Sequence, residues 1–209
     1  NPFDVLISRE KKQLQELPRG SRLGTSSLRR QAQLLNFRSD FKIEPLRGNL
    51  DTRIKKLESE NLDGIIVAAA GVIRMGWEEK ITEYLSPAKL LPAVGQGAIG
   101  IETRRNDRET NELISFIHHL DTERTVTAER SFLKNLEGGC QVPIAAFGII
   151  DNGKLFLEGL ICSLDGKVII RDKIESVIEN AEKTGFKLSE RLLSAGGRAI
   201  LDEIYGKGI

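Results

Sequence analysis

The sequence predicts an α/β domain with a mostly parallel sheet, followed by a small α+β domain with a three-stranded antiparallel sheet. Residues 17–97 alternate short apolar runs with helical patterns, an order typical of a largely parallel sheet covered by helices. Residues 120–209 contain three strand-like stretches separated by hairpin signals. A Gly- and Pro-rich break at residues 91–97 lies between the two patterns, and we interpret it as a domain crossing.

Two helix starts and two strands define the first region, residues 1–97. The Gly-Thr-Ser-Ser segment at 24–27 offers hydroxyl groups that can cap a helix, because Ser and Thr side chains accept hydrogen bonds from free backbone N–H groups. A turn and cap at 47–49 precede the second helix. Alternating apolar residues at 41–43 predict a short strand, and the continuous apolar run at 64–70 predicts a buried one.

Residues 98–119 form a short connecting region, with a strand-like stretch at 98–103 and a helix at 107–119. Two elements bury too little apolar surface to form an independent core. We therefore expect this region to pack on another part of the protein.

The third region, residues 120–209, combines helices with consecutive strands. Asp151-Asn152-Gly153 and Asp165-Gly166 are hairpin turn signals, so the strands on either side should pair antiparallel. We expect strands at 144–150, 155–163 and 168–176, and helices at 125–136, 188–193 and 198–204.

Composition argues against several classes of function. The 209-residue chain has a formal net charge of only +1, which gives no reason to expect nucleic acid or an acidic membrane surface as partner. We see no apolar run near the ~20 residues that span a bilayer, and no signal peptide pattern. The two cysteines, Cys140 and Cys162, form neither a disulfide framework nor a metal-ligand cluster, and they fit a reducing, cytoplasmic compartment.

Four arginines lie at two helix starts. Arg29 and Arg30 fall in the first helical turn after residues 24–27, and Arg47 and Arg53 flank the next helix start. A helix N-terminus exposes free N–H groups and a partial positive charge, to which guanidinium groups add fixed donors. Because helix starts follow the carboxyl ends of parallel strands, both pairs should converge on one anion-binding cleft. The alternative is that these arginines only form surface salt bridges.

A second candidate site is the Gly-Gly-Cys segment at 138–140. Two glycines permit backbone conformations that other residues resist, and Pro143 stiffens the exit, so the loop can hold the thiol of Cys140 in a cleft. The alternative is a buried structural cysteine at a tight turn. We expect Cys162 to pack within a strand, and the adjacent histidines at 118–119 to be structural residues at a helix end rather than metal ligands.

Five stretches of the chain form a set: GTSSLRRQ at 24–31, LRGN at 46–49, LPAVGQG at 91–97, TAER at 127–130 and LEGGCQVP at 136–143. Together they resemble the porphobilinogen deaminase family, also called hydroxymethylbilane synthase. The motifs recur in the family's order and approximate spacing over essentially the whole chain, and the set is far more specific than any one of them.

The resemblance implies three domains, of which the first two resemble the halves of a periplasmic-type binding protein. Residues 1–97 would be the second domain, residues 98–119 would return to the absent first domain, and residues 120–209 would be the C-terminal domain. The family's enzymes are transferases of tetrapyrrole (haem) biosynthesis, which join four porphobilinogen molecules head to tail into hydroxymethylbilane and release ammonia. A dipyrromethane cofactor, bound by a thioether to the cysteine that matches Cys140, primes the growing chain.

The resemblance also implies which residues bind cofactor and substrate. Arginines match positions that neutralise the acetate and propionate groups of the pyrroles, and small or polar residues match positions that line the cleft. The implied binding residues are Thr25, Ser27, Arg29, Arg30, Arg47, Gly48, Asn49, Arg53, Gly71 and Gln96, with Arg74 and Arg130 as further contacts. The implied partners are porphobilinogen and the growing oligopyrrole chain, with no nucleic acid, membrane or metal, and the implied state is a monomer.

One departure from the family pattern affects activity. The family's essential aspartate lies in a Lys-Asp motif upstream of every residue here, and roughly the first hundred residues of the family have no counterpart in this sequence. We therefore expect the chain alone to be inactive, whereas a complex with the upstream part as a separate chain could be active. The competing interpretation is a non-catalytic small-anion-binding module in which Cys140 is structural.

Overall fold

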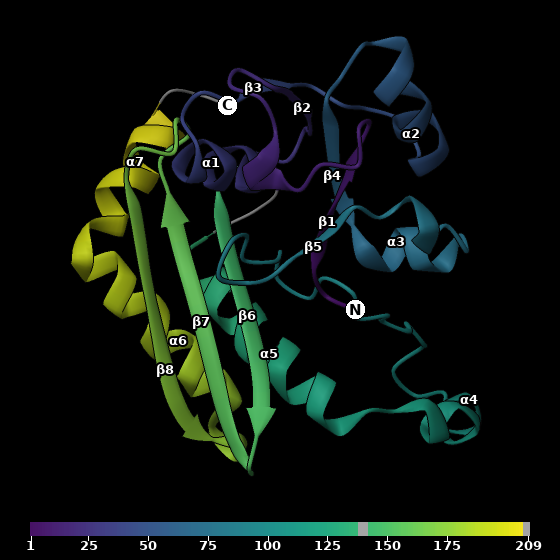
Figure 1. Cartoon of the computed structure of the whole chain (residues 1–209). Helices are drawn as coiled ribbons and strands as arrows, with labels where there is room; N and C mark the ends of the chain where they lie inside the picture. Colours follow the sequence, from purple (N-terminus) through teal and green to yellow (C-terminus); the bar gives the residue numbers. More distant parts are fainter. Residues whose placement is uncertain (138–141, 207–209) are drawn as a thin grey trace.

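The computed structural model describes residues 1–137 and 142–206, and it contains two sheets with helices packed against them. Figure 1 shows the first sheet near the N-terminus and the second formed by the three long strands in green. Within the residues described, every helix is too short or too polar to cross a membrane.

The first sheet is mixed. Its strands are β1 (Asp4–Ser8), β2 (Arg22–Gly24), β3 (Lys42–Glu44), β4 (Gly64–Ala68) and β5 (Glu83–Leu85). They are arranged in the order β3-β2-β4-β1-β5. β2 pairs in parallel with β3 and β4, whereas β1 pairs antiparallel with β4 and β5. Four strands therefore point in one direction, and β1 points in the other.

The prediction of a mostly parallel sheet is thus confirmed only in part. The sequence predicts β3 and β4 but not β2, β5 or the antiparallel strand β1. This strand lies between β4 and β5, and all of its residues are buried. A short strand that is buried on both faces has no alternating pattern, and the apolar run at 5–7 is too short to distinguish from a loop or helix segment.

Helices cover both faces of the first sheet. They are α1 (Leu28–Phe37), α2 (Leu50–Ser59) and α3 (Ala69–Arg74), with short 3-10 turns at η1 (Leu14–Glu16) and η2 (Glu78–Lys80). The α1 helix packs through Leu34 on the side of Leu6 and Ile66, whereas α2 and α3 pack on the side of Val5 and Val67. Neighbouring strand residues therefore serve opposite faces, as the period of two requires.

The predicted strand at 98–103 does not form. A strand needs a neighbour to pair its N–H and C=O groups, and none of the described strands lies beside this stretch. Ile99 is 85% exposed and Phe116 is 83% exposed. The predicted helix is present as α4 (Arg108–Ile114) and the turn η3 (Ser115–Ile117), and Figure 1 shows α4 apart from both sheets.

The second sheet is antiparallel, in the order β6-β7-β8, as the hairpin signals predict. Asn152 and Gly153 form the first turn with positive φ values of 48° and 72°. The elements are α5 (Leu120–Asn135), β6 (Ile144–Asp151), β7 (Lys154–Cys162), β8 (Ile169–Val177), η4 (Ile178–Asn180), α6 (Ala181–Leu192), the kinked connection η5 (Leu193–Gly197) and α7 (Arg198–Gly206). One face of this sheet is covered by α5, α6 and α7.

The other face of the second sheet packs against α1. Ala32 of α1 shares a buried cluster with Leu160 and Cys162 of β7. The β7–β8 turn also reaches the helix, because Asn36 Nδ2 donates to the carbonyl oxygen of Gly166 at 2.8 Å. The second sheet thereby fixes the helix whose first turn contains the paired arginines.

Candidate functional site

Three helix starts lie at one edge of the first sheet. The α1, α2 and α3 helices follow β2, β3 and β4, and these three strands are parallel. Helices that follow parallel strands begin at the carboxyl ends of those strands, where ligands collect in open α/β sheets. The arrangement that the sequence predicts for the two arginine pairs is therefore present in the backbone.

The hydroxyl residues before α1 have a different role from the one predicted. Ser27 occupies the N-cap position, but its side chain makes no capping hydrogen bond. Ser26 Oγ instead accepts from the backbone N–H of Leu46 at 2.8 Å, and Thr25 Oγ1 accepts from the N–H of Ser27 at 3.3 Å. These hydroxyls tie the loop to its own backbone and to the segment after β3. At α2 the cap is as predicted, since Asn49 Oδ1 accepts from the N–H of Thr52 at 2.8 Å.

Arg29 and Arg30 are buried and share one carboxylate, that of Asp4 on β1. Asp4 is 0% exposed, Arg29 is 5% exposed and Arg30 is 8% exposed. Arg30 donates to Asp4 Oδ1 from Nη2 at 2.7 Å and from Nε at 3.0 Å. Arg29 Nη1 lies 2.8 Å from Asp4 Oδ2. The sequence interpretation did not identify Asp4, although an acidic residue at the start of a buried apolar strand is a signal for a paired charge.

The loop at residues 91–97, the predicted domain crossing, completes this network. Gln96 Nε2 donates to Asp4 Oδ1 at 3.0 Å, and Gln96 Oε1 accepts from Arg29 Nη2 at 3.3 Å. Arg29 Nη1 also donates to the carbonyl oxygen of Leu91 at 2.6 Å. The predicted site residues Arg29, Arg30 and Gln96 are therefore in one hydrogen-bonded network.

Charge, rather than burial, decides the protonation state of Asp4. Burial raises the pKa of the Asp4 carboxyl, but the charges and hydrogen bonds of Arg29 and Arg30 outweigh it and hold the pKa below its ordinary value. Burial lowers the pKa of Arg29, with the carboxylate of Asp4 acting in the opposite direction. The group thus combines two cations with one anion, and the surplus positive charge suits an anionic ligand.

A cavity of about 440 Å³ lies beside this network, between the first sheet's helix starts and the second sheet. This volume is within the usual range for small-molecule sites, ~300–1,000 Å³. Its walls are basic and hydroxylic on one side and aliphatic on the other. The lining residues are Ser26, Ser27, Arg29, Arg30, Arg53, Ala93, Val94, Leu133, Val142 and Ile144.

Of the other predicted site residues that the structure describes, Ser27 and Arg53 also line the cavity and the rest do not. Arg53 donates from Nε to the carbonyl oxygen of Gly48 at 2.8 Å, whereas Arg47, Gly48 and Asn49 are exposed at the start of α2. Thr25 is buried. Gly71, Arg74 and Arg130 are exposed.

Of the predicted site residues, Cys140 lies outside the described residues, as do the glycines that precede it. Val142, two positions later, lines the cavity with Arg29 and Arg53. Cys162 is 0% exposed in β7, as predicted, and burial raises the pKa of its thiol to about 12. A thiol with that pKa is almost entirely protonated near neutral pH and is a poor nucleophile.

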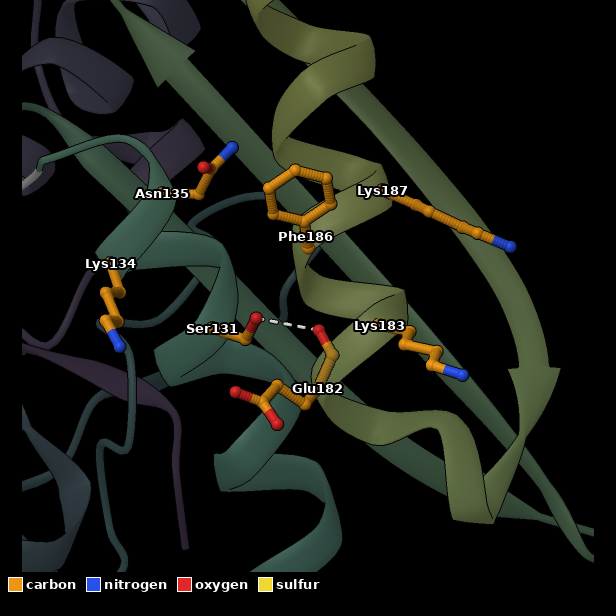
Figure 2. A pocket seen from close by; sticks show the side chains of 7 residues that line it. All are labelled: Ser131, Lys134, Asn135, Glu182, Lys183, Phe186 and Lys187. Atoms are coloured by element: carbon orange, nitrogen blue, oxygen red, sulfur yellow. Dashed lines mark hydrogen bonds between the residues drawn. The ribbon is translucent and has the colours of Figure 1, made fainter.

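A larger cavity, of about 550 Å³, lies between α5 and α6 (Figure 2). Figure 2 shows the ammonium groups of Lys183 and Lys187 pointing away from Lys134, so the lysines do not converge on one point. Ser131 Oγ donates to the backbone carbonyl of Glu182 at 2.7 Å and closes one end of the groove. This groove lacks the convergent polar groups that are typical of a ligand site.

Glu129 of α5 connects the loop at residues 91–97 to the second sheet. Its carboxylate accepts from the N–H of Gly95 at 2.6 Å and from the N–H of Gly148 at 2.8 Å. Burial raises the pKa of Glu129 to about 7, although both hydrogen bonds oppose the shift. His119 has a structural role, since its Nδ1 accepts from the N–H of Thr122 at 3.2 Å and caps α5.

Comparisons with known proteins agree with this architecture. Residues 1–112 match the family model described as porphobilinogen deaminase, dipyromethane cofactor binding domain, and residues 123–194 match the porphobilinogen deaminase C-terminal domain. The chain is 52% identical over 204 residues to a porphobilinogen deaminase of Desulforamulus reducens, with 98% of this chain and 66% of the relative covered.

Two further relatives give the same result. A porphobilinogen deaminase of Carboxydothermus hydrogenoformans is 53% identical, with 97% of this chain and 65% of the relative covered. One of Pelobacter propionicus is 49% identical, with 100% and 67% covered. The chain spans about two thirds of the length of these relatives. Because family models match both halves and the alignment with these relatives covers nearly the whole chain, this chain belongs to the porphobilinogen deaminase family.

Proposed function

We propose that this chain is the carboxylate-binding and cofactor-bearing part of a hydroxymethylbilane synthase, which joins four porphobilinogen molecules head to tail and releases ammonia. The observation that carries the proposal is the cavity on which Arg29, Arg30 and Arg53 converge. Each pyrrole unit has an acetate and a propionate group, and guanidinium groups bind carboxylates through paired, charge-assisted hydrogen bonds. The surplus positive charge around Asp4 lowers the cost of bringing several carboxylates together.

The residues beside the cavity fit a dipyrromethane cofactor attached to Cys140. Cys140 comes two positions before Val142 in the sequence, and Val142 lines the cavity. When bound, the cofactor supplies the primer to which pyrroles are added. Arg29, Arg30 and Arg53 would pair with its carboxylates, while Leu133 and Val142 would exclude water from the opposite wall.

The domain organisation is part of the same proposal. Residues 1–97 would be the second of two periplasmic-binding-protein-like domains, and the single reversed strand within an otherwise co-directional sheet supports this assignment. Residues 98–119 would pack on the upstream domain. Their exposed apolar side chains support this, because such a cluster is unusual on a free surface. They are Ile99, Ile101, Leu113, Phe116 and Ile117.

We predict that the 209-residue chain alone consumes no porphobilinogen. The family's Lys-Asp motif, whose aspartate balances positive charge on the pyrrole nitrogens, does not occur in this sequence. The measurement is porphobilinogen consumption by the pure chain, before and after addition of the upstream segment as a separate chain. A measurable rate from the pure chain would contradict the prediction.

Mass spectrometry of the intact protein tests the cofactor assignment. Dipyrromethane bound by a thioether adds a defined mass, and we expect Cys140→Ser to remove both that mass and the reaction of the protein with aldehyde reagents. Cys162→Ser is the matched control, because Cys162 is the buried thiol in β7 and should leave the adduct in place. Retention of the adduct by Cys140→Ser would sink the assignment, and absence of any adduct would favour a non-catalytic anion-binding module.

A cytoplasmic location also belongs to this proposal. Cys162 is a free, buried thiol, which is the usual state of cysteine in a reducing compartment.

A further inference from the structure

Asp4 is the one acidic side chain that joins both buried arginines of the cavity among the described residues. We propose that Asp4 is a positioning residue, which orients Arg29 and Arg30 so that their remaining N–H groups bind the carboxylates of the ligand. The inference rests on the proposed function and adds to it a residue that does not itself touch the ligand.

The geometry holds each guanidinium from its inner side. Asp4 Oδ1 accepts three hydrogen bonds, two from Arg30 and one from Gln96. The Nη1 group of Arg30 also donates to the carbonyl oxygen of Ile66 at 3.1 Å. A guanidinium group has five N–H donors in a fixed plane, so anchoring some of them fixes the direction of the rest. Both arginines line the cavity, which places the remaining donors at its wall.

The two carboxylate oxygens of Asp4 are not equivalent, and this makes a selective test possible. Three donors surround Oδ1, so the amide oxygen of Asp4→Asn should remain at that position. The amide nitrogen would then replace Oδ2, which lies 2.8 Å from Arg29 Nη1. Two N–H donors cannot satisfy each other at this separation. The substitution should therefore remove the ion pair of Arg29, leaving that guanidinium with its hydrogen bonds to Leu91 and Gln96. Arg30 should stay held by the amide oxygen at the Oδ1 position and by its hydrogen bond to the backbone of β4.

The experiment is a double-mutant cycle on the 209-residue chain, with porphobilinogen binding measured by NMR titration. Asp4→Asn and Arg29→Leu should each weaken binding by about tenfold or more, the equivalent of one charge-assisted hydrogen bond. The double variant should be no weaker than Arg29→Leu, because the two changes remove the same contact. The matched cycle pairs Asp4→Asn with Arg53→Leu. The fold-loss in affinity of this double variant should equal the product of the two single losses, because Arg53 has no contact with Asp4 among its described hydrogen bonds.

Thermal unfolding and circular dichroism establish that each variant is folded. If Asp4→Asn does not fold, Asp4→Ser takes its place and is combined with Arg29→Leu and Arg30→Leu together, because serine removes the contacts of both arginines. If the fold-losses in affinity of the Asp4 and Arg29 variants multiply in the double variant, the positioning role alone is overturned. The same follows if the Asp4 variant binds as tightly as the unaltered chain. Absence of porphobilinogen binding by the unaltered chain would overturn the proposed function and, with it, this inference.

Discussion

Two backbone N–H groups donate to the carboxylate of Glu129, and the residue is almost completely buried. Desolvation exceeds the effect of the two hydrogen bonds, and the pKa rises to about 7. Asp4 is equally buried, but two guanidinium groups hold its pKa below the ordinary value. Two buried carboxyl groups in one chain thus shift in opposite directions, because only one of them has cationic partners.

The raised pKa of Glu129 predicts that stability falls as pH rises through about 7. Between pH 4.5, its ordinary pKa, and 7 the folded state holds a proton that the unfolded state has lost, so higher pH favours unfolding. The contribution is present in full below the ordinary pKa and amounts to about 3 kcal/mol, which is lost above the shifted pKa. Urea unfolding at pH 5 and pH 8 should show a smaller loss for Glu129→Gln than for the unaltered chain.

Glu182→Gln is the control for this measurement, because Glu182 is an exposed carboxylate on the helix that packs against α5. It should follow the pH dependence of the unaltered chain. Equal pH dependence in the Glu129→Gln variant would show that this carboxyl ionises without a cost to folding.

At the scale of elements, the α5 and α6 helices cross at Gly185. A Cβ atom added there would lie 2.1 Å from the carbonyl oxygen of Ala128 and 2.7 Å from the backbone nitrogen of Phe132. The neighbours are backbone atoms, which cannot move aside without moving the helix. Gly185 thus permits a helix–helix contact closer than any side chain allows.

Gly185→Ala should destabilise the protein in spite of the better helix propensity of alanine. The propensity gain is about 1 kcal/mol, whereas overpacking costs about 1–3 kcal/mol and more when backbone must shift. We expect a net loss of about 2 kcal/mol, measured by urea unfolding. Gly206→Ala, at a glycine with no neighbour within 4 Å, should change the free energy of unfolding by less than about 0.5 kcal/mol. Equal effects at the two positions would contradict the close crossing.

The sequence predicted elements better than it predicted their partners. The hairpin of β6 and β7 followed from Asn152-Gly153, because the turn chemistry is local. β1 was missed because its burial depends on β4 and β5, which are distant in the chain. The arginines at the helix starts were predicted from local signals, whereas Asp4 was not, since no local rule pairs it with residues 29–30. The strand predicted at 98–103 does not form, because no described strand lies beside it to pair with its N–H and C=O groups.

At the scale of the whole molecule, the two sheets meet through α1. The β7–β8 turn lies directly against the helix, and a Cβ atom on Gly166 would be 2.3 Å from the carbonyl oxygen of Ala32. Arg171 adds a hydrogen bond from Nη2 to the carbonyl oxygen of Pro87 at 2.8 Å. The position of the C-terminal sheet therefore depends on a contact that only glycine permits.

Gly166→Ala should weaken the packing between the two sheets, and Gly153→Ala provides a control with the same backbone geometry. Both glycines have φ +72°, but Gly153 has no neighbour within 4 Å. Each alanine should cost about 1 kcal/mol for its left-handed backbone, and the Gly166 variant should cost about 1–3 kcal/mol more for the collision with α1. Hydrogen exchange should report faster opening of α1 in the Gly166 variant alone. Equal losses would mean that the two sheets do not depend on this contact.

The α1 helix has two roles, because its first turn presents guanidinium groups to the cavity and the following residues pack against the C-terminal sheet. Ala32, which contacts that sheet, lies less than one turn from both arginines, so a shift of the sheet along the helix would also displace the charged groups. Variants of this helix that disturb the packing of the C-terminal sheet should consequently also bind the ligand more weakly. Substitutions at Ala32 that weaken this packing should then also weaken anion binding, although every arginine is unchanged.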